Sequence, residues 1–258
     1  MKKQQTGATL MVVLILLLVI TVIGTLAIRS SLTSLNIATN SQAQQLLVQN
    51  SDAAIFNVES PNLLQRNTAY DGLFGLVKTD ANKGKELVFC YKGTATSFYD
   101  ISRASFMQWV SGTTPNNGEL GIDGYCKLDS SNNFFTSGRK AVMTQISIKV
   151  NTDTSNALGG LDRAFEHMQR GTDAEAAKID KSEKILVTAT SIVPILSTAS
   201  DTDINNCFST HMNQVVIPSN VTPAIGMNKS VSQCLQDLGV PVNTQVTEYN
   251  LTQAFDRT

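Results

Sequence analysis

The histidines are the first residues to consider for chemistry, and there are only two, His167 and His211. His211 follows Cys207 by four residues. A nucleophilic cysteine–histidine pair also needs a third group that orients the histidine, and the sequence indicates none. No GxSxG, HExxH, Walker A or GxGxxG motif is present either. We therefore expect both histidines to be surface or structural residues, and the protein not to be an enzyme.

One acidic segment has the spacing of a calcium-binding loop at its start. It contains Asp201, Asp203 and Asn205 at alternate positions. An EF-hand loop needs glycine at its sixth position and glutamate at its twelfth, and those positions hold Asn206 and Met212. We expect this segment to cap a helix or to form a polar loop, and we predict no cofactor and no metal ion.

The four cysteines form the remaining set of reactive side chains: Cys90, Cys126, Cys207 and Cys234. An even number of cysteines outside a membrane segment is compatible with two disulfides. Of the three possible connectivities, the most local is favoured, with Cys90 joined to Cys126 and Cys207 to Cys234. Each bond would stabilise the fold by roughly 3–4 kcal/mol on the entropic model. A zinc site is an alternative, although CxxC and CxxH spacings are lacking, and four separate buried thiols are another.

Composition bounds the class of protein. The chain has 258 residues, with 20 basic and 21 acidic side chains and no basic block. Sequence-independent nucleic-acid binding therefore has no electrostatic support, and no direct nucleic-acid partner is expected. Beyond an apolar N-terminal segment about 200 residues remain, which is enough for one domain with its own core.

The apolar segment runs from Ala8 to Ile28 and contains no charged residue. As a helix it would be about 31 Å long, close to the thickness of a bilayer core, about 30 Å. Lys2 and Lys3 precede it, which predicts a single span with a cytoplasmic N-terminus. A buried core helix is disfavoured by the length of the run, and a cleaved secretory signal by the length and by the lack of a good cleavage site.

The residues ahead of the span are more specific. A short basic and polar leader ends in Gly7 and is followed at once by Ala8, Thr9 and Leu10. This arrangement resembles the leader of type IV prepilins. The resemblance implies that a prepilin peptidase cleaves after Gly7 and methylates the new N-terminus at Ala8. Glycine suits such a site because it leaves the backbone accessible.

Val12 departs from the pattern of major pilins. It occupies the fifth mature position, where major pilins carry a glutamate that meets the methylated amine of a neighbouring subunit. A carboxylate in hydrocarbon costs a few kcal/mol or more unless it has a partner. A subunit at the tip has no neighbour above it, so valine there fits a tip position. The start of the mature chain resembles that of PilX-type minor pilins of type IV pili.

The resemblance implies a function, a set of partners and a location. The function is that of a minor pilin in the tip or priming complex, which initiates pilus assembly and supports twitching motility, adhesion and DNA uptake. The implied partners are other minor pilins, the major pilin, a large tip adhesin, the prepilin peptidase and the inner-membrane assembly platform. The protein would sit in the inner membrane before assembly and at the extracellular pilus tip afterwards. Two alternatives remain: a tip pseudopilin of type II secretion, and a bitopic membrane protein with an exported binding domain.

The helix is expected to continue beyond the membrane. Apolar and small residues recur at three- and four-residue steps, and the first proline after the span is Pro61. The predicted organisation is a leader over 1–7, a helix over 8–59 with its span at 8–28, and an extracytoplasmic head over 60–258.

The head is predicted to be α+β and pilin-like, with the long helix packed on an antiparallel sheet. Two segments alternate apolar and polar residues, Val142–Val150 and Ile185–Ile195, and are expected to pair antiparallel. Further strands are predicted at Glu86–Tyr91 and Ser97–Ile101. Phe106, Trp109 and Val110 have helical spacing and are expected in the core. Short helices are predicted near Leu63–Leu76, Leu161–Arg170 and Ser230–Leu238, a loop over Thr113–Gly124, and an exposed excursion over Asn151–Ser182.

Overall fold

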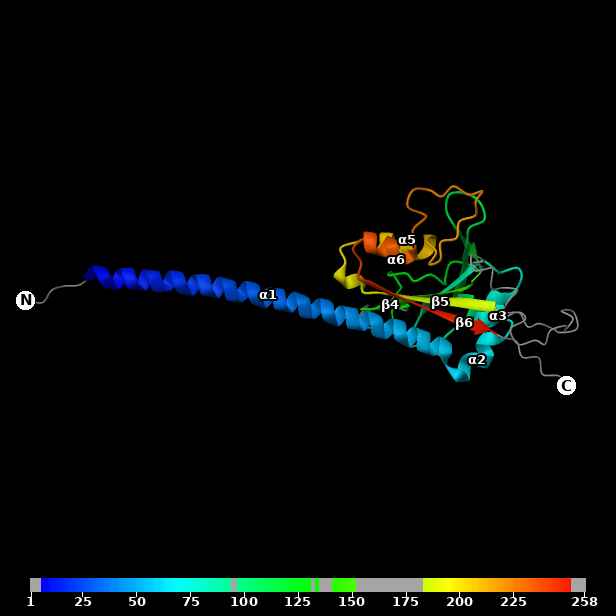
Figure 1. The fold of residues 1–258 in the computed structure, drawn as a ribbon, viewed down its shortest axis with the longest axis horizontal. Coiled ribbons are helices and arrows are strands. Elements are labelled where there is room, and N and C mark those ends of the chain that lie inside the picture. The colour runs from blue at the N-terminus through cyan, green and yellow to red at the C-terminus, as the bar shows by residue number, and fades with distance from the viewer. Residues whose placement is uncertain (1–5, 94–96, 131–132, 135–140, 152–182, 252–258) are drawn as a thin grey trace, which may run out of the picture. The chain divides into compact units, whose positions relative to one another are not determined.

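The computed structural model describes residues 6–93, 97–130, 133–134, 141–151 and 183–251 (Figure 1). The chain divides into two compact units, residues 1–45 and 46–258.

The longest element is the helix α1, Thr6–Glu59. Its sequence lacks proline, and after Gly7 its one glycine is Gly24, so no residue within it forces a break. It ends where Ser60 leaves helical geometry ahead of Pro61, because a residue before proline is disfavoured in the α region. In the described part of the chain α1 is the one helix that is long and apolar enough to cross a membrane.

Two short helices follow α1, where the sequence predicted one. They are α2, Pro61–Thr68, and α3, Leu73–Lys78. The turn between them brings Gly72 against the end of α2, and a Cβ atom on Gly72 would lie 2.1 Å from the Arg66 carbonyl oxygen. Such a contact is impossible for any residue with a side chain, so the tight turn depends on glycine at this position.

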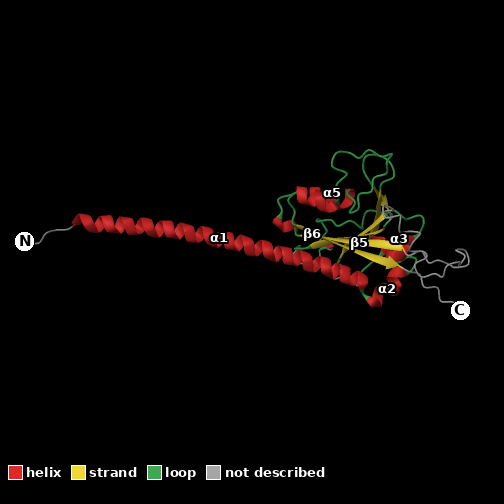
Figure 2. Cartoon of the chain, viewed as in Figure 1, coloured by secondary structure: helices red, strands yellow, loops and turns green. Residues whose placement is uncertain are grey.

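The head contains a β-sheet, drawn in yellow in Figure 2. The sheet has six strands in the order β3-β2-β1-β4-β5-β6. All neighbouring strands pair antiparallel. The predicted pairing of the two alternating segments, β4 with β5, is confirmed. The strands are β1, Glu86–Tyr91; β2, Ala104–Gln108; β3, Asn116–Glu119; β4, Met143–Val150; β5, Glu183–Ile192; and β6, Val242–Leu251.

Several predictions in the head were wrong. Ser97–Ile101 is not a strand, and its aromatic residues instead cap the core beside Phe89. Phe106 lies in strand β2 rather than a helix, and both Phe106 and Trp109 are buried, whereas Val110 is exposed. The predicted loop over Thr113–Gly124 contains the short strand β3. The sequence also failed to indicate β6, because polar residues alternate there with threonine, valine and tyrosine.

One face of the sheet forms the main apolar core with α1. Ala54, Ile55 and Val58 of the helix lie against buried side chains of four strands. The sheet contributes Leu87, Phe89, Tyr91, Ala104, Phe106, Ile146, Ile148, Val150, Ile185, Val187 and Ala189. The predicted packing of the helix on one face of the sheet is confirmed.

The C-terminal region forms a second core around Met143 and Ile192, at one end of β4 and β5. It includes the helix α5, Asp201–Thr210, and the helix α6, Val231–Asp237. Ser230 caps α6 in a complete capping box, as expected for the predicted helix near this position. The predicted helix at Leu161–Arg170 and most of the predicted excursion lie outside the described residues.

Candidate functional site

The N-terminal half of α1 is an uninterrupted apolar surface. Every side chain from Thr9 to Ile28 is exposed, and Thr21 and Thr25 are polar. Their hydroxyls donate hydrogen bonds to the carbonyls of Leu18 and Val22, at 2.8 and 2.9 Å. Because hydrocarbon offers no partner to a free hydroxyl, these internal bonds make the segment compatible with a bilayer or with an apolar filament interior.

Three sequence-predicted positions lie at the start of this helix. Gly7 and Ala8 belong to the first turn of α1, and Val12 follows one turn later. The Val12 side chain is 56% exposed, so whatever surrounds the helix contacts it directly. In α1 the first acidic residue after this point is Asp52, and the membrane segment therefore presents no carboxylate to a neighbour.

Within the head, α1 is fixed to the sheet by polar bonds as well as apolar contacts. The buried Ser51 hydroxyl donates to Ser191 Oγ at 2.9 Å, and Ser191 Oγ lies 2.7 Å from Thr144 Oγ1. Ser51 also accepts a hydrogen bond from Asn243 Nδ2 at 3.0 Å. This chain of bonds links α1 to β4, β5 and β6, and it fixes the helix in register because the bonds are directional.

Two carboxylates on the flank of α1 reach the edge strand β6. Asp52 accepts from Gln245 Nε2 at 2.5 Å, and Glu59 accepts from the Tyr249 hydroxyl at 2.8 Å. On the other side of the helix, Asn57 donates to the Tyr91 hydroxyl at 2.9 Å. The end of α1 is therefore held from both sides of its buried stripe.

The opposite face of the sheet carries a buried carboxylate, Glu86, which is 1% exposed. It accepts hydrogen bonds from the backbone N–H and side-chain amide of Asn213, at 2.8 to 3.1 Å, and from the N–H of Gln214 at 3.3 Å. Asn213 also donates to Ser147 at 2.9 Å. Glu86 thus holds the segment after α5 against the centre of the sheet through bonds to a charged acceptor, which are among the stronger kind.

Lys149 supplies the positive charge near Glu86. It is 4% exposed and lies on β4, the strand that pairs with β1. Burial lowers the pKa of the Lys149 ammonium, and the Glu86 carboxylate acts in the opposite direction. The opposite charge on the neighbouring strand lowers the cost of burying each of the two groups.

Two disulfides close the C-terminal region and the neighbouring loop. Cys90 is joined to Cys126 with a Cα–Cα distance of 4.9 Å, and Cys207 to Cys234 with one of 5.7 Å. These are the two pairs that the sequence favoured. None of the four sulfurs is a free thiol, so they are not available as zinc ligands.

The remaining candidates from the sequence are the two histidines and the acidic segment that begins at Asp201. His211 is 7% exposed and follows α5, with Nδ1 3.0 Å from Thr210 Oγ1. Asp201 and Asp203 lie in the first turn of α5, where Ser200 caps the helix. His167 lies outside the described residues. Among the residues that the structure describes, no group of three or more histidine, cysteine or acidic side chains could hold a metal ion.

Sequence reasoning missed the buried Glu86. One signal could have indicated it, because Glu86 opens an otherwise apolar strand and lies next to Lys85. A lone charge at the start of a buried strand needs a partner, but nothing in the sequence identifies the partner as Asn213, which is 127 residues away.

Comparison with known proteins identifies one part of the chain. Residues 6–56 match the family model described as PilX N-terminal. Neither a curated protein nor a solved structure gives a significant match. The matched residues cover almost the whole of α1, from the predicted cleavage site to the part packed on the sheet.

The match of residues 6–56 to this N-terminal family implies a minor pilin of a type IV pilus. Pilins are structural proteins, anchored in a membrane by their apolar helix, that associate with other pilus components. The head agrees with that assignment, since a long helix lies on an antiparallel sheet. Residues 6–56 are similar to the PilX N-terminal domain and are followed by an α+β head, an arrangement consistent with a PilX-type type IV pilin.

Proposed function

We propose that this chain is a structural subunit of the tip or priming complex of a type IV pilus. In that position it starts fibre assembly together with other minor pilins and supports display of a large adhesin. Twitching motility, adhesion and DNA uptake then depend on it indirectly. The observation that carries the proposal is Val12, an exposed apolar residue at the fifth mature position of the helix.

The argument from Val12 is energetic. A glutamate at this position would place a carboxylate in hydrocarbon, at a cost of a few kcal/mol or more without a partner. A subunit inside a fibre has the amine of its neighbour as that partner, and a subunit with nothing above it has none. Valine removes this cost. Inside a fibre the missing carboxylate would leave the neighbour's amine unpaired, whereas a subunit at the tip has no such neighbour above it.

The charges of the leader favour its removal before the helix enters a fibre. Lys2 and Lys3 hold the N-terminus on the cytoplasmic side of the membrane, and they would be buried among apolar side chains if the helix moved into a fibre with its leader attached. We propose cleavage between Gly7 and Ala8 by a prepilin peptidase, with methylation of the new amine. The protein then moves from the inner membrane, through contact with an assembly platform and the major pilin, to the extracellular tip.

Processing is tested by mass spectrometry of the protein from a strain with an active prepilin peptidase. The expected mature N-terminus is an N-methylated Ala8. Gly7→Val is expected to leave the leader in place, because a branched side chain blocks access to the scissile bond, while Gln5→Ala serves as a control that is still processed. Recovery of the intact initiator methionine from assembled fibres contradicts the proposal.

The tip position is tested with Val12→Glu, using Val12→Ala as the matched control. Deletion of the protein is expected to reduce surface pili and twitching strongly, and wild type and Val12→Ala restore both. Val12→Glu is expected to restore them poorly, since an unpaired carboxylate disfavours the terminal position. Immunogold labelling should place the wild-type head at fibre ends. A deletion that abolishes protein secretion but leaves pili unchanged supports the type II secretion alternative instead.

A further inference from the structure

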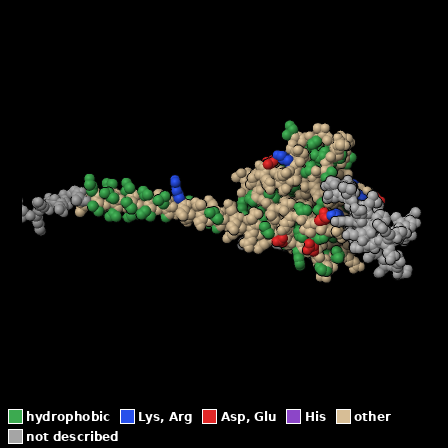
Figure 3. Space-filling view, in the orientation of Figure 1, with side chains coloured by type: hydrophobic (Ala, Val, Ile, Leu, Met, Phe, Trp, Pro, Cys, Tyr) green, Lys and Arg blue, Asp and Glu red, His purple; other side chains and the backbone are tan. Residues whose placement is uncertain are grey.

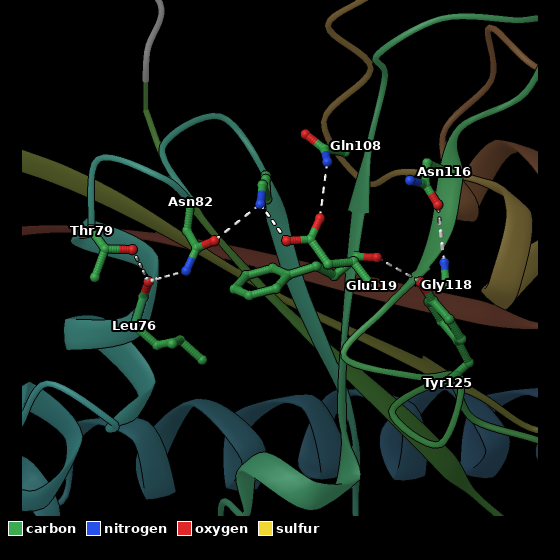
Figure 4. A network of polar contacts seen from close by, with 10 residues as sticks. Leu76, Thr79, Asn82, Gln108, Asn116, Gly118, Glu119 and Tyr125 are labelled. Carbon is green, nitrogen blue, oxygen red and sulfur yellow. Dashed lines mark hydrogen bonds and ion pairs between the residues drawn. The ribbon is translucent and has the colours of Figure 1, made fainter.

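The two edges of the sheet are built differently, and the β3 edge is closed. Strand β3 has four residues and its pairing with β2 is interrupted by a register shift. Glu119 forms an ion pair with Lys85 and accepts from Gln108 Nε2 at 3.0 Å (Figure 4). The Tyr125 hydroxyl donates to the Asn117 carbonyl of β3 at 3.0 Å. A short, bulged edge with a satisfied polar network offers little to an incoming strand.

The β6 edge is long and regular instead. Its ten residues pair with β5 without a register shift, and its sequence contains neither proline nor lysine, the residues that commonly block an edge. No described strand pairs with its other side, since β6 ends the strand order. Val246 on this strand is 58% exposed.

The hydrogen-bond pattern identifies the backbone groups that face outward. The Val193 N–H donates to the Pro241 carbonyl, so these opposed residues form a hydrogen-bonded pair at the start of the ladder. Antiparallel ladders alternate, and alternate residues of β6 therefore direct their N–H and C=O away from β5. The outward set includes Thr244, Val246 and Glu248.

The flank of α1 adds charge above this edge. Asp52 and Glu59 bond to Gln245 and Tyr249, whose side chains lie four residues apart on the helix-facing side of β6, about 13 Å along the strand. Within the described residues no basic side chain forms an ion pair with either carboxylate. Figure 3 shows acidic side chains over the C-terminal end of α1.

We propose that β6 is a docking edge for an extended segment of another protein, which adds a seventh strand to the sheet. The segment carries lysine or arginine on the side that faces α1, four positions apart, so that these charges lie beside Asp52 and Glu59. Backbone pairing with β6 supplies affinity, and the charges supply register. The inference goes beyond the proposed function, because an open edge binds a strand wherever the subunit is placed.

A second copy of this chain is a poorer occupant. Pairing β6 with β6 across a two-fold axis would bring two sets of Asp52, Glu59 and Glu248 to one interface. Glu248 has Lys184 at 2.7 Å as a local partner, whereas the two helix carboxylates would gain only like charges. Such a juxtaposition costs several kcal/mol at an interface, so the charge pattern favours a basic partner.

The test uses the full chain in detergent micelles and a fluorescent, capped peptide. The peptide has threonine at every second position and lysine or valine at the positions between. Fluorescence anisotropy measures binding. The unmodified peptide is expected to bind, and the same peptide N-methylated at alternate residues on its pairing edge is expected to bind at least about tenfold more weakly. Equal binding of the two peptides overturns the proposal, because backbone pairing would then play no part.

Variants separate the backbone and charge contributions. Val246→Pro removes one outward N–H while the bonds to β5 remain, and it should abolish binding. Asp52→Lys with Glu59→Lys should reject the lysine peptide and accept a matched glutamate peptide, which wild type rejects. Asp237→Lys, on the surface of α6, is the control that changes neither preference. Failure of the charge-reversed pair to exchange preferences overturns the assignment of a basic partner.

A photo-crosslinker at position 246 identifies the occupant in cells. A crosslink from position 246 to a basic segment of another protein is the expected result. A crosslink predominantly between two copies of this chain assigns the edge to self-association and overturns the proposal.

Discussion

The two faces of the sheet are buried by different means. On the face toward α1, apolar side chains such as Ile148 and Val187 meet an apolar helical stripe. On the far face, buried polar side chains such as Glu86, Gln145 and Ser147 meet α5 and the segment that follows it. Residues adjacent in β4 therefore lie in opposite environments. The helix face is stabilised mainly by non-directional burial. The far face adds directional bonds and two covalent links to its own apolar clusters.

Because of this difference, the two faces should respond differently to substitutions. Apolar contacts tolerate small changes of shape, because a neighbouring side chain can move into the vacant space. A buried hydrogen-bonded carboxylate does not tolerate loss of its partner, since the groups that remain are desolvated and unpaired. We expect changes on the far face to be the more damaging, residue for residue.

The largest effect is expected from Glu86→Ala. It removes the acceptor for Asn213 and Gln214 and leaves Lys149 buried without its counter-charge, so we expect a loss of about 3–5 kcal/mol in the free energy of unfolding. Urea titration of the full chain in micelles measures this. Fluorescence of Trp109, the single tryptophan of the chain, reports the unfolding, because Trp109 is buried in an apolar cluster with Val88, Met107 and Tyr125.

The Glu86 prediction has two internal checks. Glu86→Ala combined with Lys149→Met is expected to be more stable than Glu86→Ala alone, because the uncompensated charge is gone. Asp71→Ala removes an exposed ion pair with Arg66 and should leave the unfolding midpoint unchanged. If the double variant is no more stable than the single one, Lys149 does not depend on Glu86.

The next effect concerns the disulfide between Cys207 and Cys234, which ties α5 to α6. Replacing both cysteines by serine is expected to cost about 2–4 kcal/mol, measured by the same titration. Because α5 and α6 cover one end of the sheet, Trp109 fluorescence should change at a lower urea concentration than the far-ultraviolet circular dichroism of α1. Coincident transitions would show that the far face does not open separately.

A smaller effect is expected from Ile148→Val on the helix face. Ile148 is fully buried, and removal of one methylene typically costs about 0.5–1.5 kcal/mol. The urea dependence of the unfolding free energy should be unchanged, because the change leaves a small void and no unpaired polar group. A loss as large as that of Glu86→Ala would contradict the contrast between the faces.

The same contrast explains which parts of the fold could be predicted from the sequence. The helix face could be, because β4 and β5 alternate with period two and α1 has an uninterrupted apolar stripe up to Pro61. The far face could not, because Glu86 and Asn213 are bonded over 127 residues and polar side chains such as Gln145 give no sign of being buried. Strand β6 was not predicted for a similar reason, because it lies at the edge of the sheet and most of its side chains are polar.

The candidate site divides in the same way. The membrane helix, Gly7, Ala8 and Val12 were evident because their signals are local in sequence. The bonds from Asp52 and Glu59 to β6 depend on the tertiary packing of α1 and could not be anticipated before β6 was known.

The smallest effect is a pH dependence that belongs to the far face. Burial lowers the pKa of His211, and the hydrogen bonds of its ring with the backbone only partly oppose this. The folded state then resists protonation, while in the unfolded state histidine titrates near about 6.5. Stability should therefore be constant at higher pH and fall as the pH drops below that value towards the lower pKa of the folded state. His211→Gln should flatten this slope between pH 7.5 and 5.5 in thermal unfolding, whereas an unaltered slope would assign it to the carboxylates instead.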